Sequence, residues 1–444
     1  PLLFACSATE SKIPKKANSF VLTNINIVDV EHKTIVPNQT LTIEQGKITN
    51  IARQESLKSP KHAKIIDGKN GYITPGLIDM HVHMYEPAAY VFALSHGVTH
   101  VRIMNGIPAQ LKWRDKINQG AQIGSTSTVS SPIISGYKNA YLHHGVTTKA
   151  EASQVVNQYH QQGYDVIKAY GNLNQQALAG VIEQAKALNI PVAKHGPHGS
   201  GELGLSQLSH LQSFEHVEDI YQGPLNYQTD LTMLMAAIAE LKTTGVAITP
   251  TLNIYHQLTR LSREKHAFLS TINQAYTSDI IGLEARENQV KRWLIASYDM
   301  AKHNVKTLAF LKFITHKLHE AEVPLLVGSD SGVLLSPHGI ATHTEMKLMI
   351  EAGLTTYDVL QAATINPAKA LDLGKQLGKI AIGYTADFIY TTSNPVENIG
   401  ILENSNAVIK QGNWYARTEL DQLTATAIEQ RSVWQEFKAL FEAL

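Results

Sequence analysis

Short apolar runs separated by turn residues stand near both ends of the chain. Between residues 19 and 73 these runs are interrupted by Gly46 and by the pairs Asp67-Gly68 and Asn70-Gly71, which favour tight turns between antiparallel strands. A similar pattern returns at 376–416. We therefore predict a small β-sandwich domain formed by the N-terminal segment 19–73 and the C-terminal segment 376–416.

Between these two segments, short apolar runs alternate with amphipathic helical stretches. The stretch 174–188, for example, places Leu178, Val181, Ile182, Ala185 and Leu188 on one helical face. Alternating strands and helices indicate an α/β protein with a parallel sheet. The predicted strands are 76–82, 98–104, 126–131, 165–170, 191–195, 213–216, 246–251 and 324–329.

Eight such units predict a (β/α)8 TIM barrel over residues 74–375, with catalytic groups at the carboxyl ends of the strands. An open doubly wound sheet is the alternative, but no Gly-x-Gly-x-x-Gly motif follows the first strand. The stretch 253–320 is predicted to be a helical insertion. It would cap the barrel mouth, or else form an outer helix pair or a contact in a homo-oligomer. Residues 417–444 are predicted to form a C-terminal helix.

Composition narrows the classes of function. Hydrophobic residues make up 43% of the 444 residues and charged residues 17%, which is typical of a folded globular protein. Lys plus Arg equals Asp plus Glu at 38 each, so no basic field favours nucleic acid as a partner. Twenty histidines against one cysteine indicate that any metal site uses nitrogen and oxygen ligands.

The single cysteine, Cys6, ends the apolar run Leu2-Leu3-Phe4-Ala5 and resembles the lipid-attachment site of a bacterial lipoprotein. Residues 1–18 would then be a lipoprotein signal remnant and a polar tether. This interpretation predicts an enzyme of the bacterial cell envelope or periplasm with a lipid anchor on Cys6. The alternative is an incidental cysteine at a frayed N-terminus, in a cytoplasmic protein.

Metal-ligand residue types gather at the ends of the predicted strands. His81 and His83 stand at i and i+2 on one strand, so both side chains project from the same face. Lys168, His195, His216 and Asp330 end four further strands. A lone strand-end histidine is more often a hydrogen-bonded structural residue, and Asp330 could cap the next helix. Those separate explanations do not account for such groups ending five strands.

These motifs resemble the amidohydrolase superfamily. The resemblance is carried by 75–83, 97–102, the ends of the strands just named, 328–330, 362–368 and 383–388. It implies the binuclear type with a carboxylated lysine, in the prolidase-like and imidazolonepropionase-like branch.

The resemblance also implies roles. His81, His83 and Asp330 would hold one divalent metal ion, and His195 and His216 a second. Lys168, carboxylated by carbon dioxide, would bridge the two ions, for which Zn²⁺ fits the ligands best. The ions would supply an activated water, and Asp330 would take its proton and return it to the leaving amine.

The expected reaction is hydrolysis of a C–N bond in an amide or peptide by a hydroxide that bridges the metals. The expected substrate is a small molecule or dipeptide, so the chain would be an Xaa-Pro dipeptidase or an N-acyl amino acid hydrolase. His143 or His144 would contact the scissile carbonyl oxygen, and the residues alone leave open which of them does so. Arg102 would bind a substrate carboxylate, and Tyr170 and Tyr221 would line the pocket. The alternatives are a deaminase, a lactonase or esterase, and an inactive binding lipoprotein.

Overall fold

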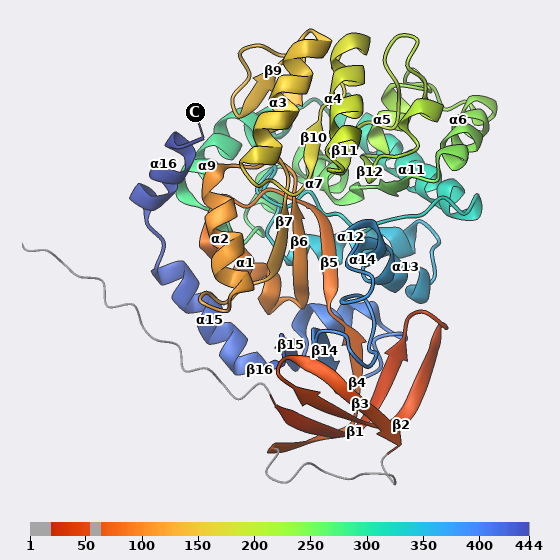
Figure 1. Ribbon diagram of the computed structural model, residues 1–444. Coiled ribbons are helices and arrows are strands. Elements are labelled where there is room, and N and C mark those ends of the chain that lie inside the picture. The colour runs from red at the N-terminus through yellow and green to blue at the C-terminus, as the bar shows by residue number, and fades with distance from the viewer. Residues whose placement is uncertain (1–18, 54–63, 444) are drawn as a thin grey trace, which may run out of the picture.

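The computed structural model describes residues 19–53 and 64–443 (Figure 1). Cys6 and the predicted tether 1–18 lie outside the described residues, so the lipid anchor and the envelope location stay predictions. None of the helices that the structure describes combines the length and the apolar character needed to cross a bilayer.

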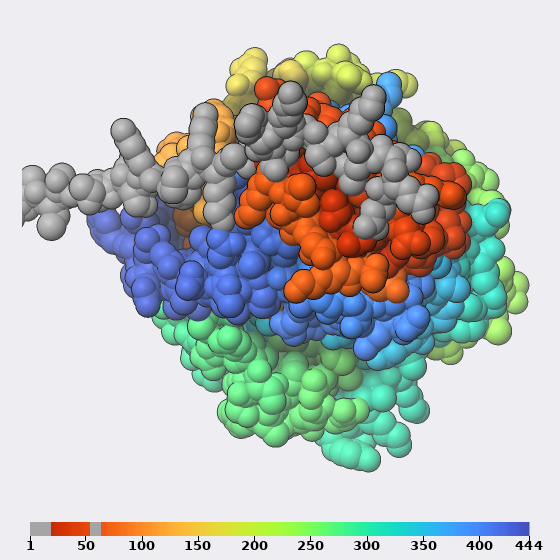
Figure 2. Space-filling view, turned by 90° about the horizontal axis from the view of Figure 1, so that it is seen from below, coloured from red at the N-terminus to blue at the C-terminus, as the bar shows by residue number. Residues whose placement is uncertain are grey.

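Strands from both ends of the chain form one seven-stranded sheet. Its order is β16-β15-β14-β4-β1-β2-β3. Strand β4 from the N-terminal segment pairs antiparallel with β14 from the C-terminal segment, and Ile73 lies opposite Tyr390. This pairing joins the two ends of the chain in one sheet. Its apolar core includes Leu22, Ile43 and Phe388. The view from below shows the red N-terminal and blue C-terminal residues side by side (Figure 2). The strands are β1 (Phe20–Asp29), β2 (Thr34–Glu44), β3 (Lys47–Arg53), β4 (Lys64–Pro75), β14 (Phe388–Thr391), β15 (Ala407–Lys410) and β16 (Asn413–Ala416). Since these strands make one continuous sheet, the predicted sandwich of two layers stays a prediction.

The middle of the chain forms parallel strands. A three-stranded sheet has the order β5-β6-β7, and a six-stranded sheet has the order β13-β12-β11-β10-β8-β9. Single parallel bridges join Ser130 to Val166, Ile248 to Leu325 and Val82 to Ser331. The strands are β5 (Leu77–Val82), β6 (Val98–Ile103), β7 (Thr126–Val129), β8 (Ile133–Ser135), β9 (His143–Gly145), β10 (Ile167–Ala169), β11 (Val192–His195), β12 (Ser213–Glu215) and β13 (Ala247–Thr249). Seven of these lie where the sequence predicts strands, and β8 and β9 are additional. The predicted eighth strand, 324–329, is a bridged extended segment.

Helices alternate with the parallel strands, as the periodicity predicts. Helix α4 buries Leu178, Val181, Ile182 and Ala185, four of the five positions expected from the sequence, and the fifth, Leu188, is partly buried just after the helix ends. The helices are α1 (Pro87–Ser95), α2 (Pro108–Asn118), α3 (Lys149–Gln161), α4 (Gln175–Ala187), α5 (Glu218–Gln222), α6 (Leu231–Thr244), α7 (Leu252–Glu264), α8 (His266–Leu269), α9 (Asp279–Glu284), α10 (Lys291–Leu294), α11 (Tyr298–Glu320), α12 (Ile340–Glu351), α13 (Thr356–Ala362) and α14 (Ile365–Ala370).

Two regions elaborate this frame. The predicted insertion is covered by α7–α11, with a π-helical turn at Ala285–Val290. The C-terminal stretch forms two helices rather than one, α15 (Arg417–Glu429) and α16 (Val433–Phe441). The second helix starts anew because the Ser432 side chain accepts a hydrogen bond from the Gln435 N–H as an N-cap. Helix α16 lies beside α9 (Figure 1).

Candidate metal centre

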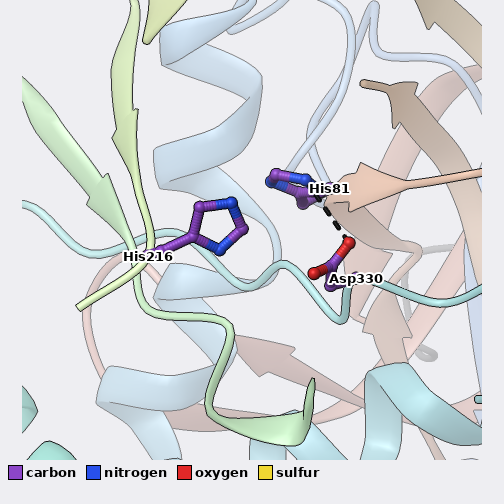
Figure 3. A group of neighbouring side chains, drawn as sticks. All are labelled: His81, His216 and Asp330. Carbon is purple, nitrogen blue, oxygen red and sulfur yellow. Dashed lines mark ion pairs between the residues drawn. The ribbon is translucent and has the colours of Figure 1, made fainter. Parts of the chain in front are cut away.

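Three predicted ligands converge at the ends of separate strands. His81 lies on β5, His216 follows β12, and Asp330 follows the bridged segment 324–329 (Figure 3). One candidate ligand atom of each lies within 4.8 Å of the others. Asp330 Oδ1 is 3.5 Å from His81 Nε2 and 2.9 Å from His83 Nε2. His83 therefore joins the same cluster through Asp330.

The remaining two predicted ligands lie next to these. The His195 ring centroid is 4.4 Å from that of His216, which in turn is 4.8 Å from that of His81. Lys168 is 2% exposed, and its Nζ has no hydrogen-bond partner among the described residues. Burial lowers the pKa of Lys168 to about 8, although the carboxylate of Glu215 acts against this. An unpartnered buried amine is costly, so this atom needs a ligand or a chemical modification to be satisfied.

Two histidines of the cluster, His81 and His216, are held by side chains that the sequence did not single out, and a carboxylate lies near a third, His195. His81 Nδ1 is 2.8 Å from Glu215 Oε2, and His216 Nδ1 is 2.7 Å from Thr251 Oγ1. His195 Nε2 is 3.1 Å from Asp219 Oδ2. In His81 and His216 one ring nitrogen is thus held by a protein side chain, as is usual for histidines that bind a metal through the other nitrogen. Of these three partners, only Glu215 could have been suspected from the sequence, because it is a carboxylate in an apolar strand directly before His216.

The backbone turns sharply where the ligands leave their strands. His216 and Asp330 have φ values of 70° and 53°, and Thr251 has 54°. Non-glycine residues seldom occupy this left-handed region, and such strain clusters at functional sites. Here the turn places both side chains next to His81.

The charge states suit metal binding. Burial lowers the pKa of His81 to about 4 and that of His216 to about 3, so both rings are neutral at pH 7. Neutral imidazole is the form that binds metals. Burial alone would raise the pKa of Asp330, but the rings of His81, His83 and His216 lower it below the usual range. The Asp330 carboxylate is therefore ionised, and the donor set fits a divalent cation.

Arg102 does not reach a substrate. Its guanidinium is fully buried and donates to the carbonyl of Met80, to Gln212 Oε1, to Ser213 Oγ and to Glu215 Oε1. The predicted contact with a substrate carboxylate is wrong, because protein groups already satisfy this side chain. Arg102 instead counters burial and keeps the pKa of Glu215 well below its usual range.

The two neighbouring histidines of β9 point to different surroundings. The ring of His143 lies 5.2 Å from that of Tyr170, which lies 4.2 Å from that of His195. His144 contacts the Tyr159 hydroxyl on α3, at 3.0 Å from Nδ1. His143 and Tyr170 are therefore brought to the cluster, and His144 is not.

Tyr221 also lies elsewhere. On α5 its ring packs 5.7 Å from that of Tyr227 and 5.7 Å from that of Phe310 on α11. The structure thus places it in aromatic packing, without bringing it to the ligands.

Comparison with known proteins identifies the family of the chain. The model of the amidohydrolase family matches residues 72–415. The chain belongs to the amidohydrolase family. Over 405 residues it is 25% identical to the imidazolonepropionase of Vibrio cholerae serotype O1, covering 85% of this chain and 94% of that protein.

Two solved structures share the fold of this amidohydrolase. Bottromycin amidohydrolase superposes with a TM-score of 0.77 at 20% identity, over 94% of this chain and 91% of the other. A Xaa-Pro dipeptidase with bound methionine in its active site superposes with a TM-score of 0.68 at 22% identity, over 90% of this chain and all of the other.

Proposed function

We propose that this amidohydrolase is a metal-dependent enzyme that hydrolyses the C–N bond of a dipeptide or an N-acyl amino acid. The observation that carries the proposal is the convergence of His81, His216 and Asp330, together with the unpartnered amine of Lys168, whose charge acts on both histidines. The family and its hydrolase relatives support hydrolysis of a C–N bond. The fold shared with a Xaa-Pro dipeptidase supports the narrower choice of a dipeptide.

Five strand ends would hold two divalent ions, with Zn²⁺ the best match to imidazole and carboxylate ligands. His81, His83 and Asp330 would bind one ion, and His195 and His216 the other. When bound, such ions make a water acidic enough to act near neutral pH and polarise a carbonyl oxygen.

Lys168 would bridge the two ions as a carbamate. The neutral amine attacks the carbon of carbon dioxide, a nitrogen–carbon bond forms, and one proton is released to solvent. A pKa of about 8 supports this step, because the reactive neutral form is far more abundant at pH 7 than in an exposed lysine.

Two residues would act on the substrate. Asp330 accepts a proton at a carboxylate oxygen as the nucleophile attacks and passes it to the leaving nitrogen. His143 has Nδ1 3.1 Å from Ser135 Oγ, so Nε2 can face the substrate carbonyl oxygen. Tyr170 lies between His143 and His195 and would form the adjoining wall of the pocket.

Barrel closure would explain why the ligands meet. The bridges at Ser130–Val166, Ile248–Leu325 and Val82–Ser331 connect the parallel strands in a ring, which supports the predicted (β/α)8 barrel. In such a barrel the carboxyl ends of all strands face one rim.

A panel of substrates tests this function. Purified protein loaded with Zn²⁺ in bicarbonate should hydrolyse Xaa-Pro dipeptides or N-acyl amino acids, and His143→Ala should lower kcat. Turnover of amino-purines in place of these would instead favour a deaminase, and turnover of lactones or esters would favour a lactonase or esterase. A panel without turnover, from protein that binds the metal, would favour an inactive binding protein.

A further inference from the structure

A small cavity lies beside His83, at the edge of the candidate metal centre. It is narrow, with room for about one water molecule. One wall comes from the chain after β5, a second from the segment leading into α9, and a third from the loop after Asp330. The lining residues are His83, Tyr85, Glu86, Tyr276, Thr277, Ser278, Ile281, Gly332, Ser336 and His338.

The C-terminal segment is attached to two of these walls. Arg431, just before α16, makes a two-point contact with Glu86, with N–O distances of 2.9 and 2.5 Å. Its guanidinium also lies 5.1 Å from the centre of the Phe92 ring. Five residues further on, the carboxylate of Glu436 accepts the N–H groups of Ile280 and Ile281, both at 3.0 Å.

Glu436 replaces a cap that α9 lacks. Ser278, the N-cap residue of α9, makes no capping bond with its own side chain. The Glu436 carboxylate, 6% exposed, satisfies two amides of the first turn from about 155 residues away in the sequence. Ala439 and Leu440 of the same helix pack in one apolar cluster with Ile281 and Tyr85.

The third wall is attached to the same assembly. Gln289, in the π-helical turn after α9, accepts the N–H of Leu334 at 2.8 Å. Through this hydrogen bond, a shift of α9 would also move the loop directly after Asp330, which carries Gly332 and Ser336.

We infer that Arg431 and Glu436 form a C-terminal clamp that holds the walls of the cavity together and limits access to the metal centre from the His83 side. Both are positioning residues, since they act through Glu86 and α9 without lining the cavity. The inference about access depends on the proposed metal function, whereas the coupling between α16, α9 and the loop does not.

The test uses Glu436→Gln in the full-length protein, with Glu442→Gln as the matched control. Glu442 pairs at 3.0 Å with Lys112, whose side chain is 66% exposed, so its loss should change little. In E436Q, amide exchange in 274–290 and in 331–338 should be about tenfold faster, the scale of a lost helix cap. Loss of Zn²⁺ to excess EDTA, followed with a zinc-responsive dye, should accelerate to a similar degree.

The exchange and metal-release results together distinguish a clamp from a local helix cap. Faster exchange in 274–290 alone, with unchanged release of Zn²⁺, would overturn the clamp and leave Glu436 as a local cap. No change in any readout would overturn it too. If the wild type holds no Zn²⁺, the proposed function fails, and exchange in 331–338 then decides for or against the clamp. Arg431→Lys, which keeps the charge but loses the two-point contact, should move the same readouts less and serves if E436Q does not fold.

Discussion

Two buried lysines at opposite ends of the parallel strands have opposite surroundings. Lys168, on β10 beside the ligand cluster, has no partner for its Nζ. Lys410, at the end of β15, contacts Asp387 at 2.5 Å and Thr126 Oγ1 at 3.0 Å, where β7 begins. At that same end His100 has both ring nitrogens within 3.0 Å of threonine hydroxyls.

This difference distinguishes polar groups that stabilise the fold from polar groups that could bind a ligand. At the amino ends, the side chains of Lys410 and His100 are satisfied by protein groups, as is normal for buried polar atoms. At the carboxyl ends, Lys168 Nζ and Asp330 Oδ1 lack hydrogen bonds, and His216 and Asp330 adopt strained backbone conformations. At this rim unsatisfied atoms and strained backbone thus occur together, and bound metal ions would compensate for them.

Among variants that keep the metal centre loaded, the largest loss of turnover should come from Asp330→Asn. The amide keeps an oxygen for a metal ion but cannot accept the proton, so kcat should fall by about 10²–10⁴. Steady-state rates together with metal content by mass spectrometry check this. A loss below about fivefold would remove Asp330 from proton transfer.

At the amino ends of the parallel strands, Lys410→Met should lower the free energy of unfolding without changing the rate of hydrolysis. It leaves the carboxylate of Asp387, 6% exposed, without its cation, and breaking such a buried pair costs about 3 kcal/mol or more. Urea unfolding measures the loss, and kcat at 25 °C should stay unchanged. A change in kcat with unaltered stability would contradict the purely structural role of Lys410.

Lys168→Met should do the reverse: it should abolish activity yet stabilise the metal-free protein. Burial moves the pKa of Lys168 from 10.5 to about 8, so the charged amine costs the fold about 3 kcal/mol below pH 8. Between pH 8 and 10.5 the unfolded chain binds more protons, and the wild type regains this free energy as pH rises.

The stability gap between Lys168→Met and the wild type should therefore close from pH 8 to about pH 10.5. Urea unfolding in metal-free, carbon dioxide-depleted buffer measures this gap. A destabilised variant at pH 7 would show that Lys168 is better satisfied than its surroundings indicate.

The smallest effect should come from Thr251→Val. It removes the hydroxyl that orients His216 and should weaken metal binding about tenfold, the lower end for such orienting partners. Competition with a chelator of known affinity measures the change. Thr249→Val, on β13 but outside this contact, is the control, and equal effects of the two variants would contradict an orienting role.

The sequence predicts that the candidate ligands lie together, because a polar residue that ends an apolar strand is visible without a structure. The structure brings ligand atoms of His81, His216 and Asp330 within 4.8 Å of one another. The partners of those ligands were not visible: Asp219 and Thr251 reach His195 and His216 across separate elements. Arg102 was misread for the same reason, since only the fold shows that Glu215 occupies its guanidinium. Neighbouring residues on β9 face opposite ways, so His143 and His144 could not be told apart without the register of that strand.

Metal stoichiometry tests the central claim most directly. After loading with Zn²⁺ in bicarbonate and removal of free metal, the wild type should retain two equivalents, and Lys168→Met should retain one or fewer. Retention of no metal by a folded wild type, or of equal amounts by both proteins, would contradict a centre built from these strand ends.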